Sequence, residues 1–329
     1  MKKVLTLGFA ILIAVAWTGP AAAAEYKAVL KLASVVNMDH PYMIGGQKFA
    51  DLIKERTNGR ITVKLYPSNQ LGKGEREMTE GIQQGVIELL VTSSGPLGGF
   101  SPSMNILDFP FLFRDAKHAD LVLDGPIGQK LLDDLGKANI KALAFWENGF
   151  RQLTNSRGPV KNVEDAKGLK IRTMENKVHL AAWKAAGVNP TPMAWGEVFT
   201  ALQQKVIDGQ ENPVAGIYTN KLWNAGQKFF SVTAHVYSPV LLLMSPKAFN
   251  AMPKEDQQLV LKTGLEVAKF QRKVVRDTEE GQMQDMAKQG VTVTRDVDRE
   301  SFKKAMGPVY SQFSAEFSKA DIDAIMNAK

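Results

Sequence analysis

The chain has 329 residues, 44% of them hydrophobic, which is typical of about two packed domains and excludes a disordered or fibrous protein. Its 41 basic and 34 acidic residues, a net charge of +7, are interspersed rather than grouped, which predicts a solvated surface and no nucleic-acid partner. The absence of cysteine excludes disulfides, thiolate metal sites and cysteine nucleophiles.

Residues 1–24 are predicted to be a secretory signal peptide. Lys2 and Lys3 precede an apolar run from Val4 to Trp17, and Ala22-Ala23-Ala24 offers a cleavage site before Glu25. A membrane anchor is the alternative, but the run is short for a bilayer span. The mature chain is therefore expected to begin at Glu25 and to act in the periplasm. It keeps 39 basic and 34 acidic residues, and this mildly basic charge favours an anionic ligand.

The first half of the mature chain alternates strands and helices, which indicates an α/β lobe. The stretch VIELLVTSS is apolar on nearly every position and suits the centre of a covered parallel sheet. Ligands of such sheets bind beyond the carboxyl ends of the strands, so Thr92, Ser93 and Ser94 are expected at the mouth of the lobe. The predicted elements are a strand at 26–33, a helix after Pro41, a strand at 61–67, a helix at 75–84, a strand at 86–94, a helix at 116–138 and a strand at 140–147.

The second half repeats this alternation and ends in helices. The proline-rich stretch 189–193 cannot be helical. More than 80 residues follow the second lobe, and part of them is expected to return to the first. The predicted elements are a strand at 168–174, helices at 177–186 and 197–204, a buried strand at 240–244, a long helical region at 253–289, and mostly helix at 297–326.

One segment of the chain echoes another. GIQQGVIELLV (81–91) and ALQQKVIDGQE (201–211) align without gaps at a separation of 120 residues. The echo predicts two lobes of similar topology. Thr92 and Ser93 in one lobe are expected to lie opposite Asn212 and Pro213 in the other.

Two arginines are candidates for an anion site. Arg172 lies on a predicted strand, where its guanidinium could hold a carboxylate through two parallel hydrogen bonds or could simply face solvent. Arg151 lies between Phe150 and Leu153, and either a ligand or a structural ion pair would explain a charge in that apolar setting.

Other polar and aromatic residues could complete the site. Glu211 and Asn212 follow an Asp-Gly turn and precede Pro213, so they could contact a ligand or could serve the turn. Trp195 could form a pocket wall or belong to the core. Glu75 could cap its helix or accept hydrogen bonds from ligand hydroxyls.

Motifs of enzymes and metal sites are weak throughout the sequence: a Ser-x-x-Lys at 301–304 and a Lys-Thr-Gly at 262–264 stand in reversed order in helical stretches and are interpreted as chance. It contains no HExxH, no phosphate loop, no glycine fingerprint and no GxSxG. The histidines are scattered without ligand spacing and are expected on helix surfaces or in loops, at positions 40, 118, 179 and 235. We therefore expect no metal and no cofactor.

The mature chain resembles the DctP-type solute-binding proteins of tripartite ATP-independent periplasmic (TRAP) transporters. The resemblance implies an α/β periplasmic binding protein fold, Venus-flytrap-like, with a mixed β-sheet flanked by helices in each lobe and a long helix spanning both. Expected boundaries are 25–148 plus 239–277 for the first lobe and 149–238 plus 278–329 for the second. The ordered segments that carry the resemblance are SNQLGKGERE (68–77), NGFRQLTN (148–155), KGLKIR (167–172), NPTPMAWGEVFTALQQ (189–204) and VIDGQENP (206–213).

The same resemblance implies the residues that bind the ligand. Arg172 takes the position of the family's usual carboxylate partner, and Glu75 and Ser93 fall where the first lobe meets the variable end of the ligand. Sialate-binding members tend to carry an acid at the position of Ser93, so the serine argues against sialate. The full predicted ligand-binding set is Arg172, Arg151, Asn212, Trp195, Glu75, Ser93 and Tyr237.

The implied function is capture of a small organic acid anion and its delivery to TRAP membrane subunits by hinge closure. The protein is expected to be a monomer and not an enzyme. Two alternatives stay open: an exported enzyme acting on a small organic acid, and a binding protein that serves an ATP-driven importer. Carboxylates, sulfonates, uronates and aromatic acids would all suit an arginine fork.

Overall fold

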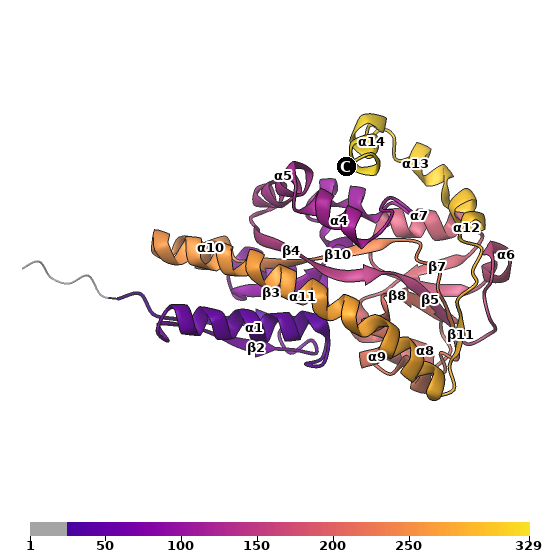
Figure 1. The fold of residues 1–329 in the computed structure, drawn as a ribbon, viewed down its shortest axis with the longest axis horizontal. Helices are drawn as coiled ribbons and strands as arrows, with labels where there is room; N and C mark the ends of the chain where they lie inside the picture. The colour runs from indigo at the N-terminus through magenta and orange to yellow at the C-terminus, as the bar shows by residue number, and fades with distance from the viewer. Residues whose placement is uncertain (1–24) are drawn as a thin grey trace, which may run out of the picture.

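The structure, a computed structural model, describes residues 25–329, and the predicted signal peptide lies outside them. Two mixed β-sheets with helices packed around them form the described part of the chain (Figure 1). Within residues 25–329, no helix combines the length and the apolarity of a membrane span. The predicted α/β fold with two mixed sheets is confirmed.

The five-stranded sheet has the order β2-β1-β3-β10-β4. Strands β1, β2 and β3 are parallel, and β10 pairs antiparallel with both β3 and β4. Its strands are β1 (Ala28–Ala33), β2 (Ile61–Tyr66), β3 (Leu89–Ser93), β4 (Lys141–Phe150) and β10 (Tyr237–Met244). The helices of this part of the chain are α1 (Pro41–Arg56), α2 (Glu75–Gln84), α3 (Ser94–Leu97), the 3-10 helix η1 (Pro102–Asp108), α4 (Ala116–Leu123), α5 (Pro126–Asp134) and η2 (Leu135–Ala138).

The helix predicted for 116–138 is wrong as a single element, because it is divided between Leu123 and Pro126. Proline has no N–H to continue the helix, and Pro126 instead occupies the first turn of α5, where no such donor is needed. The strand predicted at 86–94 begins only at Leu89, since Gly85 (φ 73°) ends α2 in the left-handed conformation and a turn follows.

The six-stranded sheet has the order β11-β9-β5-β8-β6-β7. The proline-rich stretch forms its edge strand β7. Pro190 and Pro192 have no N–H group, and at these positions the N–H would point to the open side of the sheet, where no strand accepts it. The strands are β5 (Gln152–Asn155), β6 (Lys170–Thr173), β7 (Asn189–Pro192), β8 (Gly209–Asn212), β9 (Phe229–Ser231) and β11 (Thr292–Thr294). Helices α6 (Val163–Ala166), α7 (Lys177–Ala185), α8 (Trp195–Gln203), α9 (Val214–Thr219) and η3 (Leu222–Ala225) accompany them.

The 120-residue echo corresponds to a structural repeat. Helix α2 and strand β3 begin at Glu75 and Leu89, and α8 and β8 begin 120 residues later, at Trp195 and Gly209. The strand orders β2-β1-β3-β10 and β7-β6-β8-β5 also correspond. The prediction of two lobes with similar topology is therefore confirmed.

Two chain segments cross between the sheets side by side. Strand β4 continues into β5 with only Arg151 between them, and the segment after β9 leads back into β10. The Arg151 N–H donates to the carbonyl oxygen of Val236 at 2.8 Å, so the two crossings are paired where they pass between the lobes.

A single long helix spans both lobes, as predicted. Helix α11 (Lys254–Lys288) has 35 residues and packs on α1 and β4 at one end and on α9 and β11 at the other (Figure 1). The short helix α10 (Pro246–Asn250) precedes it.

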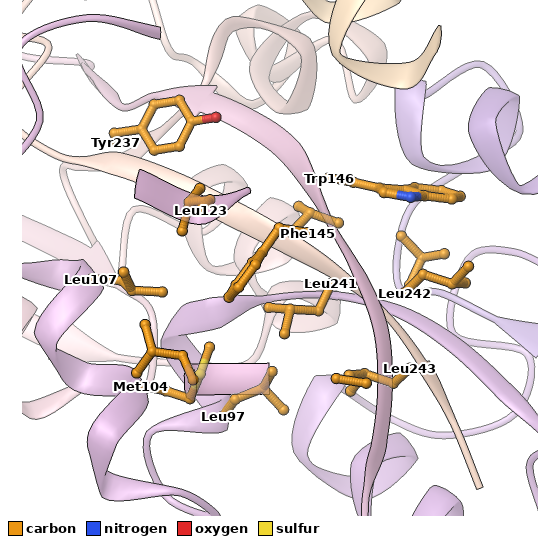
Figure 2. Packing of buried hydrophobic residues seen from close by; sticks show 14 of the residues in the cluster. Leu97, Met104, Leu107, Leu123, Phe145, Trp146, Tyr237, Leu241, Leu242 and Leu243 are labelled. Atoms are coloured by element: carbon orange, nitrogen blue, oxygen red, sulfur yellow. The ribbon is translucent and has the colours of Figure 1, made fainter. Parts of the chain in front are cut away.

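Strands β4 and β10 form the centre of the first core. Phe145 of β4 lies beside Leu241 of β10, and Trp146 lies beside Leu242 (Figure 2), and all four are buried. This confirms the buried strand predicted at 240–244. Because β4 is held in the core up to Trp146, the residues that follow it emerge between the lobes at a fixed position.

The C-terminal part of the chain packs against segments that accompany both sheets. Phe313 and Phe317 pack edge-on against Phe109 at ring distances of 6.1 and 5.6 Å, while α12 and α13 contact α7. The lobe boundaries expected from the sequence stay a prediction. These helices are α12 (Arg299–Met306), α13 (Pro308–Gln312) and α14 (Lys319–Met326).

Candidate ligand site

A cavity lies between the two lobes at the carboxyl ends of β3, β6 and β8. It encloses about 350 Å³ of empty space, including its opening to solvent. Six of the seven predicted binding residues line it, and Tyr237 does not. The lining residues are Val35, Val36, His40, Tyr42, Glu75, Ser93, Asn148, Arg151, Arg172, Met174, Trp195, Asn212 and Gly216.

Arg172 of β6 is held rigidly, and one end of its guanidinium is free. Its Nε and Nη2 donate to the carbonyl oxygen of Met193 at 2.9 and 2.6 Å, and the Trp195 ring lies 5.6 Å from the guanidinium carbon. Nη1 has no partner in the described chain. The residue is 2% exposed, which excludes a solvent-facing arginine. Burial, followed by the neighbouring charge of Arg151, lowers the pKa of Arg172 to about 10, so it remains a cation at neutral pH.

Arg151 closes a buried ion pair, as one of its two sequence interpretations predicted. Its Nε and Nη2 both contact the carboxylate of Glu211 in β8, with Nη2 2.9 Å from Oε1, and Nη2 also donates to the Glu211 carbonyl oxygen. Its Nη1 has no partner within residues 25–329. Arg151 therefore combines a structural pairing with one free donor group at the cavity.

Two histidines complete the charge network behind Arg151. His235 Nε2 lies 3.0 Å from Glu211 Oε2, and His179 Nε2 lies 3.1 Å from Asp108 Oδ1. Burial would raise the pKa of Glu211, but Arg151 and the histidines bring it well below its usual range. Burial also opposes the charge of His179, yet its bond to Asp108 and the nearby carboxylate of Glu211, 3.7 Å from Nδ1, raise its pKa above the ordinary value.

The positions expected for the histidines hold only in part. His40 and His235 lie in loops, whereas His118 and His179 lie in helices, and all four side chains are buried. His179 lies inside the interface between α7 and η1. His118, His179 and His235 have partners far away in the chain, so no local spacing reveals their burial.

Glu75 is the acid of the first lobe at the cavity. It is the first residue of α2, where the helix dipole favours a negative charge, and it is 8% exposed. Its Oε1 accepts hydrogen bonds from Thr92 Oγ1 (3.1 Å), the Ser93 N–H (3.0 Å) and Ser93 Oγ (2.7 Å). All hydrogen bonds to the Glu75 carboxylate within the described chain end on Oε1, which leaves Oε2 free at the cavity.

The repeat places equivalent positions on opposite walls. Glu75 and Trp195 are the first residues of α2 and α8, and Ser93 and Asn212 lie at the ends of β3 and β8. All four line the cavity. Of the four residues predicted to face one another across the cleft, Ser93 and Asn212 line the cavity, whereas Thr92 and Pro213 do not.

Several lining residues were missed by sequence reasoning. Asn148 carries a buried Oδ1 without a partner in the described residues and lies in the same NGFRQ segment as Arg151, which was its available signal. Tyr42 and His40 flank Pro41 and have no comparable signal. His40 Nδ1 accepts from the Tyr42 N–H at 3.2 Å, and burial lowers the pKa of His40 to about 3, so it is neutral.

Tyr237 does not line the cavity, although it directly follows Val236, the partner of the Arg151 N–H. Its ring packs between Phe113 and Phe150 at centroid distances of 5.4 and 5.2 Å, and its hydroxyl has no partner within residues 25–329. In the described chain no group of three or more His, Cys, Asp or Glu side chains is arranged to hold a metal ion.

Most of the chain is similar to known proteins. Residues 32–316 match the model of the family described as bacterial extracellular solute-binding protein, family 7 (DctP). The chain is 46% identical over 281 residues to a solute-binding protein of Verminephrobacter eiseniae, covering 85% of this chain and 83% of that protein. It is 42% identical over 264 residues to the 2,3-diketo-L-gulonate-binding periplasmic protein of Escherichia coli, with 80% of each chain covered.

Solved structures show the same relationship. A TRAP periplasmic solute-binding protein from a Polaromonas species, bound to D-erythronate, is 43% identical with a TM-score of 0.90, covering 92% of this chain and 99% of that one. The sugar acid binding protein of Advenella mimigardefordensis, in complex with galactonate, is 31% identical with a TM-score of 0.88, covering 92% and 97% of the two chains.

Proposed function

Because this chain belongs to the bacterial extracellular solute-binding proteins of family 7, the DctP family, we propose that it captures a small organic acid anion and delivers it to the membrane subunits of a TRAP transporter. The observation that carries the proposal is the buried Arg172, whose Nη1 faces an interlobe cavity without a protein partner. A buried guanidinium group of this kind requires an acceptor, and a carboxylate supplies one. Relatives that bind 2,3-diketo-L-gulonate, D-erythronate and galactonate support an acid ligand.

Binding is proposed to close the two lobes on the ligand. Arg172 and Trp195 of the second lobe hold the carboxylate end, with Asn212 and the free Nη1 of Arg151 beside them. Glu75 and Ser93 of the first lobe contact the other end. A ligand that touches both lobes stabilises the closed arrangement over an open one by the contacts that only the closed arrangement allows.

Substitution of Arg172 tests this function. Arg172→Ala leaves the ligand carboxylate without its partner at a cost of about 3–5 kcal/mol, a loss of a few hundredfold or more in affinity. Arg172→Lys keeps the charge but loses the planar pair of donors, so its affinity should lie between those of the wild type and the alanine variant.

Titration calorimetry with D-erythronate, galactonate and galacturonate measures these affinities, and Arg295→Ala, at an exposed ion pair, serves as the control. Unchanged affinity in Arg172→Ala would remove Arg172 from the site.

The setting of this function is proposed from the same relationships. Residues 1–24 are proposed to direct export to the periplasm, where the protein acts as a monomer without catalysis. A bound acid recovered unchanged after incubation with substoichiometric protein would support binding over turnover. Genes for two membrane subunits without an ATPase beside this gene would distinguish a TRAP transporter from an ATP-driven importer.

A further inference from the structure

We infer that Glu75 makes the cavity selective for hydroxylated monocarboxylates and against dicarboxylates of the same length. The inference rests on the proposed function, because it assigns the ligand carboxylate to Arg172 and asks what the opposite end of the ligand must be.

The first step is the free oxygen of Glu75. Oε1 already accepts three hydrogen bonds, from Thr92 and Ser93, while Oε2 is left at the cavity without a protein donor. A closed cavity removes water from this oxygen, and a buried acceptor without a donor is costly. The ligand must therefore supply a donor there, which a hydroxyl group does and a carboxylate does not.

The second step is the charge balance of the lining. Arg151 is neutralised by Glu211 on the second lobe, so Arg172 is the cation that remains for a ligand. Glu75 adds a negative charge on the first lobe. Arg172 can thus pair with one ligand carboxylate, whereas a second one would be buried without a cation of its own.

The third step is the neutrality of the other polar first-lobe residues that line the cavity with Glu75. His40 is uncharged because burial lowers its pKa to about 3, and Tyr42, Ser93 and Asn148 carry no charge either. A carboxylate at this end of the ligand would face Glu75 directly, and two like charges in a poorly hydrated site repel strongly. The first-lobe end therefore accepts hydroxyl groups and rejects an acid.

Two matched ligand pairs test this selectivity. D-erythronate and meso-tartrate differ only in that the terminal CH₂OH group of the first is a carboxylate in the second, and galactonate and galactarate differ in the same way. Calorimetric or competition titration of the wild type should give a dissociation constant at least tenfold lower for the monocarboxylate of whichever pair fits the cavity. A dicarboxylate that binds as tightly as its partner would overturn the inference.

The variant Glu75→Gln identifies the residue responsible. Glutamine can keep its oxygen toward Thr92 and Ser93 and turns a donor instead of an acceptor to the cavity. Monocarboxylate affinity should fall at least tenfold and dicarboxylate affinity should rise, so the ratio reverses or approaches one. Glu80→Gln, a partly exposed acid on the same helix, should leave the ratio unchanged.

The outcomes separate the inference from the function on which it rests. If Arg172→Ala abolishes binding but Glu75→Gln leaves the ratio as in the wild type, only the role of Glu75 is rejected. If neither pair nor galacturonate binds the wild type, the proposed function fails as well. A circular dichroism spectrum matching the wild type confirms that a variant has folded.

Discussion

Two buried arginines stand at the cavity, and their partners give them different roles. Arg151 meets the full charge of Glu211, whereas Arg172 meets only the carbonyl oxygen of Met193. A carbonyl group orients a guanidinium without cancelling its charge, so Arg172 keeps its attraction for an anion. Arg151 instead fixes the wall of the site where the chain crosses between the lobes.

Breaking the Arg151 ion pair should destabilise the protein. Glu211→Gln preserves the shape of the side chain but leaves Arg151 buried without a counter-charge, which lowers the free energy of unfolding by about 3–5 kcal/mol. Urea denaturation measures the effect. Glu280→Gln, which breaks the exposed pair with Arg295, should change it by about 1 kcal/mol or less. Equal effects of the two substitutions would contradict the structural role of the buried pair.

At the scale of elements, helix α11 fixes strand β4 where the strand reaches the cavity. Gln271 accepts from the Glu147 N–H at 2.8 Å and donates to its carbonyl oxygen at 2.7 Å. Arg276 donates to the Glu147 carboxylate at 2.7 Å. The next residue, Asn148, lines the cavity, so the helix that spans both lobes also sets the position of a ligand-facing side chain.

The contact between α11 and β4 should depend on pH. Burial, opposed by Arg276, raises the pKa of Glu147 from 4.5 to about 7. The folded protein therefore binds more protons than the unfolded chain between about pH 4.5 and 7, so this group lowers the free energy of unfolding as the pH rises through that window.

The variant Glu147→Gln lacks this titration. Its stability relative to the wild type should improve by roughly 2–3 kcal/mol between pH 5 and pH 8, measured by urea denaturation at each pH. Comparison with the wild type cancels the groups that titrate in both proteins. Parallel stability curves for the two proteins would show that Glu147 does not titrate in this range.

At the scale of the whole molecule, the two lobes touch across the cleft through equivalent helix starts. A Cβ atom at Gly74 would lie 3.1 Å from the Cβ of Ala194, and one at Gly196 would lie 2.9 Å from Asn69 Nδ2 and 3.2 Å from the carbonyl oxygen of Lys73. Asn37 Nδ2 also donates to the Thr219 carbonyl oxygen at 2.9 Å. The absence of side chains at the two glycines allows α2 and α8 to approach this closely.

A side chain at Gly196 should therefore oppose closure. Gly196→Val introduces overlap that only the closed arrangement experiences, at about 1–3 kcal/mol, so the affinity for the acid ligand should fall about tenfold or more. Titration calorimetry measures the affinity, and small-angle scattering measures the compaction on binding.

The control for Gly196→Val is Gly281→Ala in α11, where no atom lies within 4 Å of the added carbon. It should leave the affinity unchanged and raise stability by up to about 1 kcal/mol through helix propensity. Wild-type affinity in Gly196→Val would mean that ligand binding does not require this close approach.

The sequence alone predicted the repeat, most of the helices and strands, and six of the residues that line the cavity. Apolar periodicity and turn residues act between near neighbours, so strands, helices and the 120-residue echo could be predicted from short segments. The family motifs placed Arg172 and Asn212 in a ligand site, and both line the cavity.

Tertiary structure decided which polar groups meet. Arg151 and Glu211 are 60 residues apart in the chain and meet through the pairing of β5 with β8. His179 and Asp108 are 71 residues apart and meet where α7 packs on η1. The same geometry brings Tyr42 and His40 into the cavity and buries Tyr237 among aromatic rings. Local sequence patterns cannot predict such contacts, because each contact depends on how distant segments of the chain pack against one another.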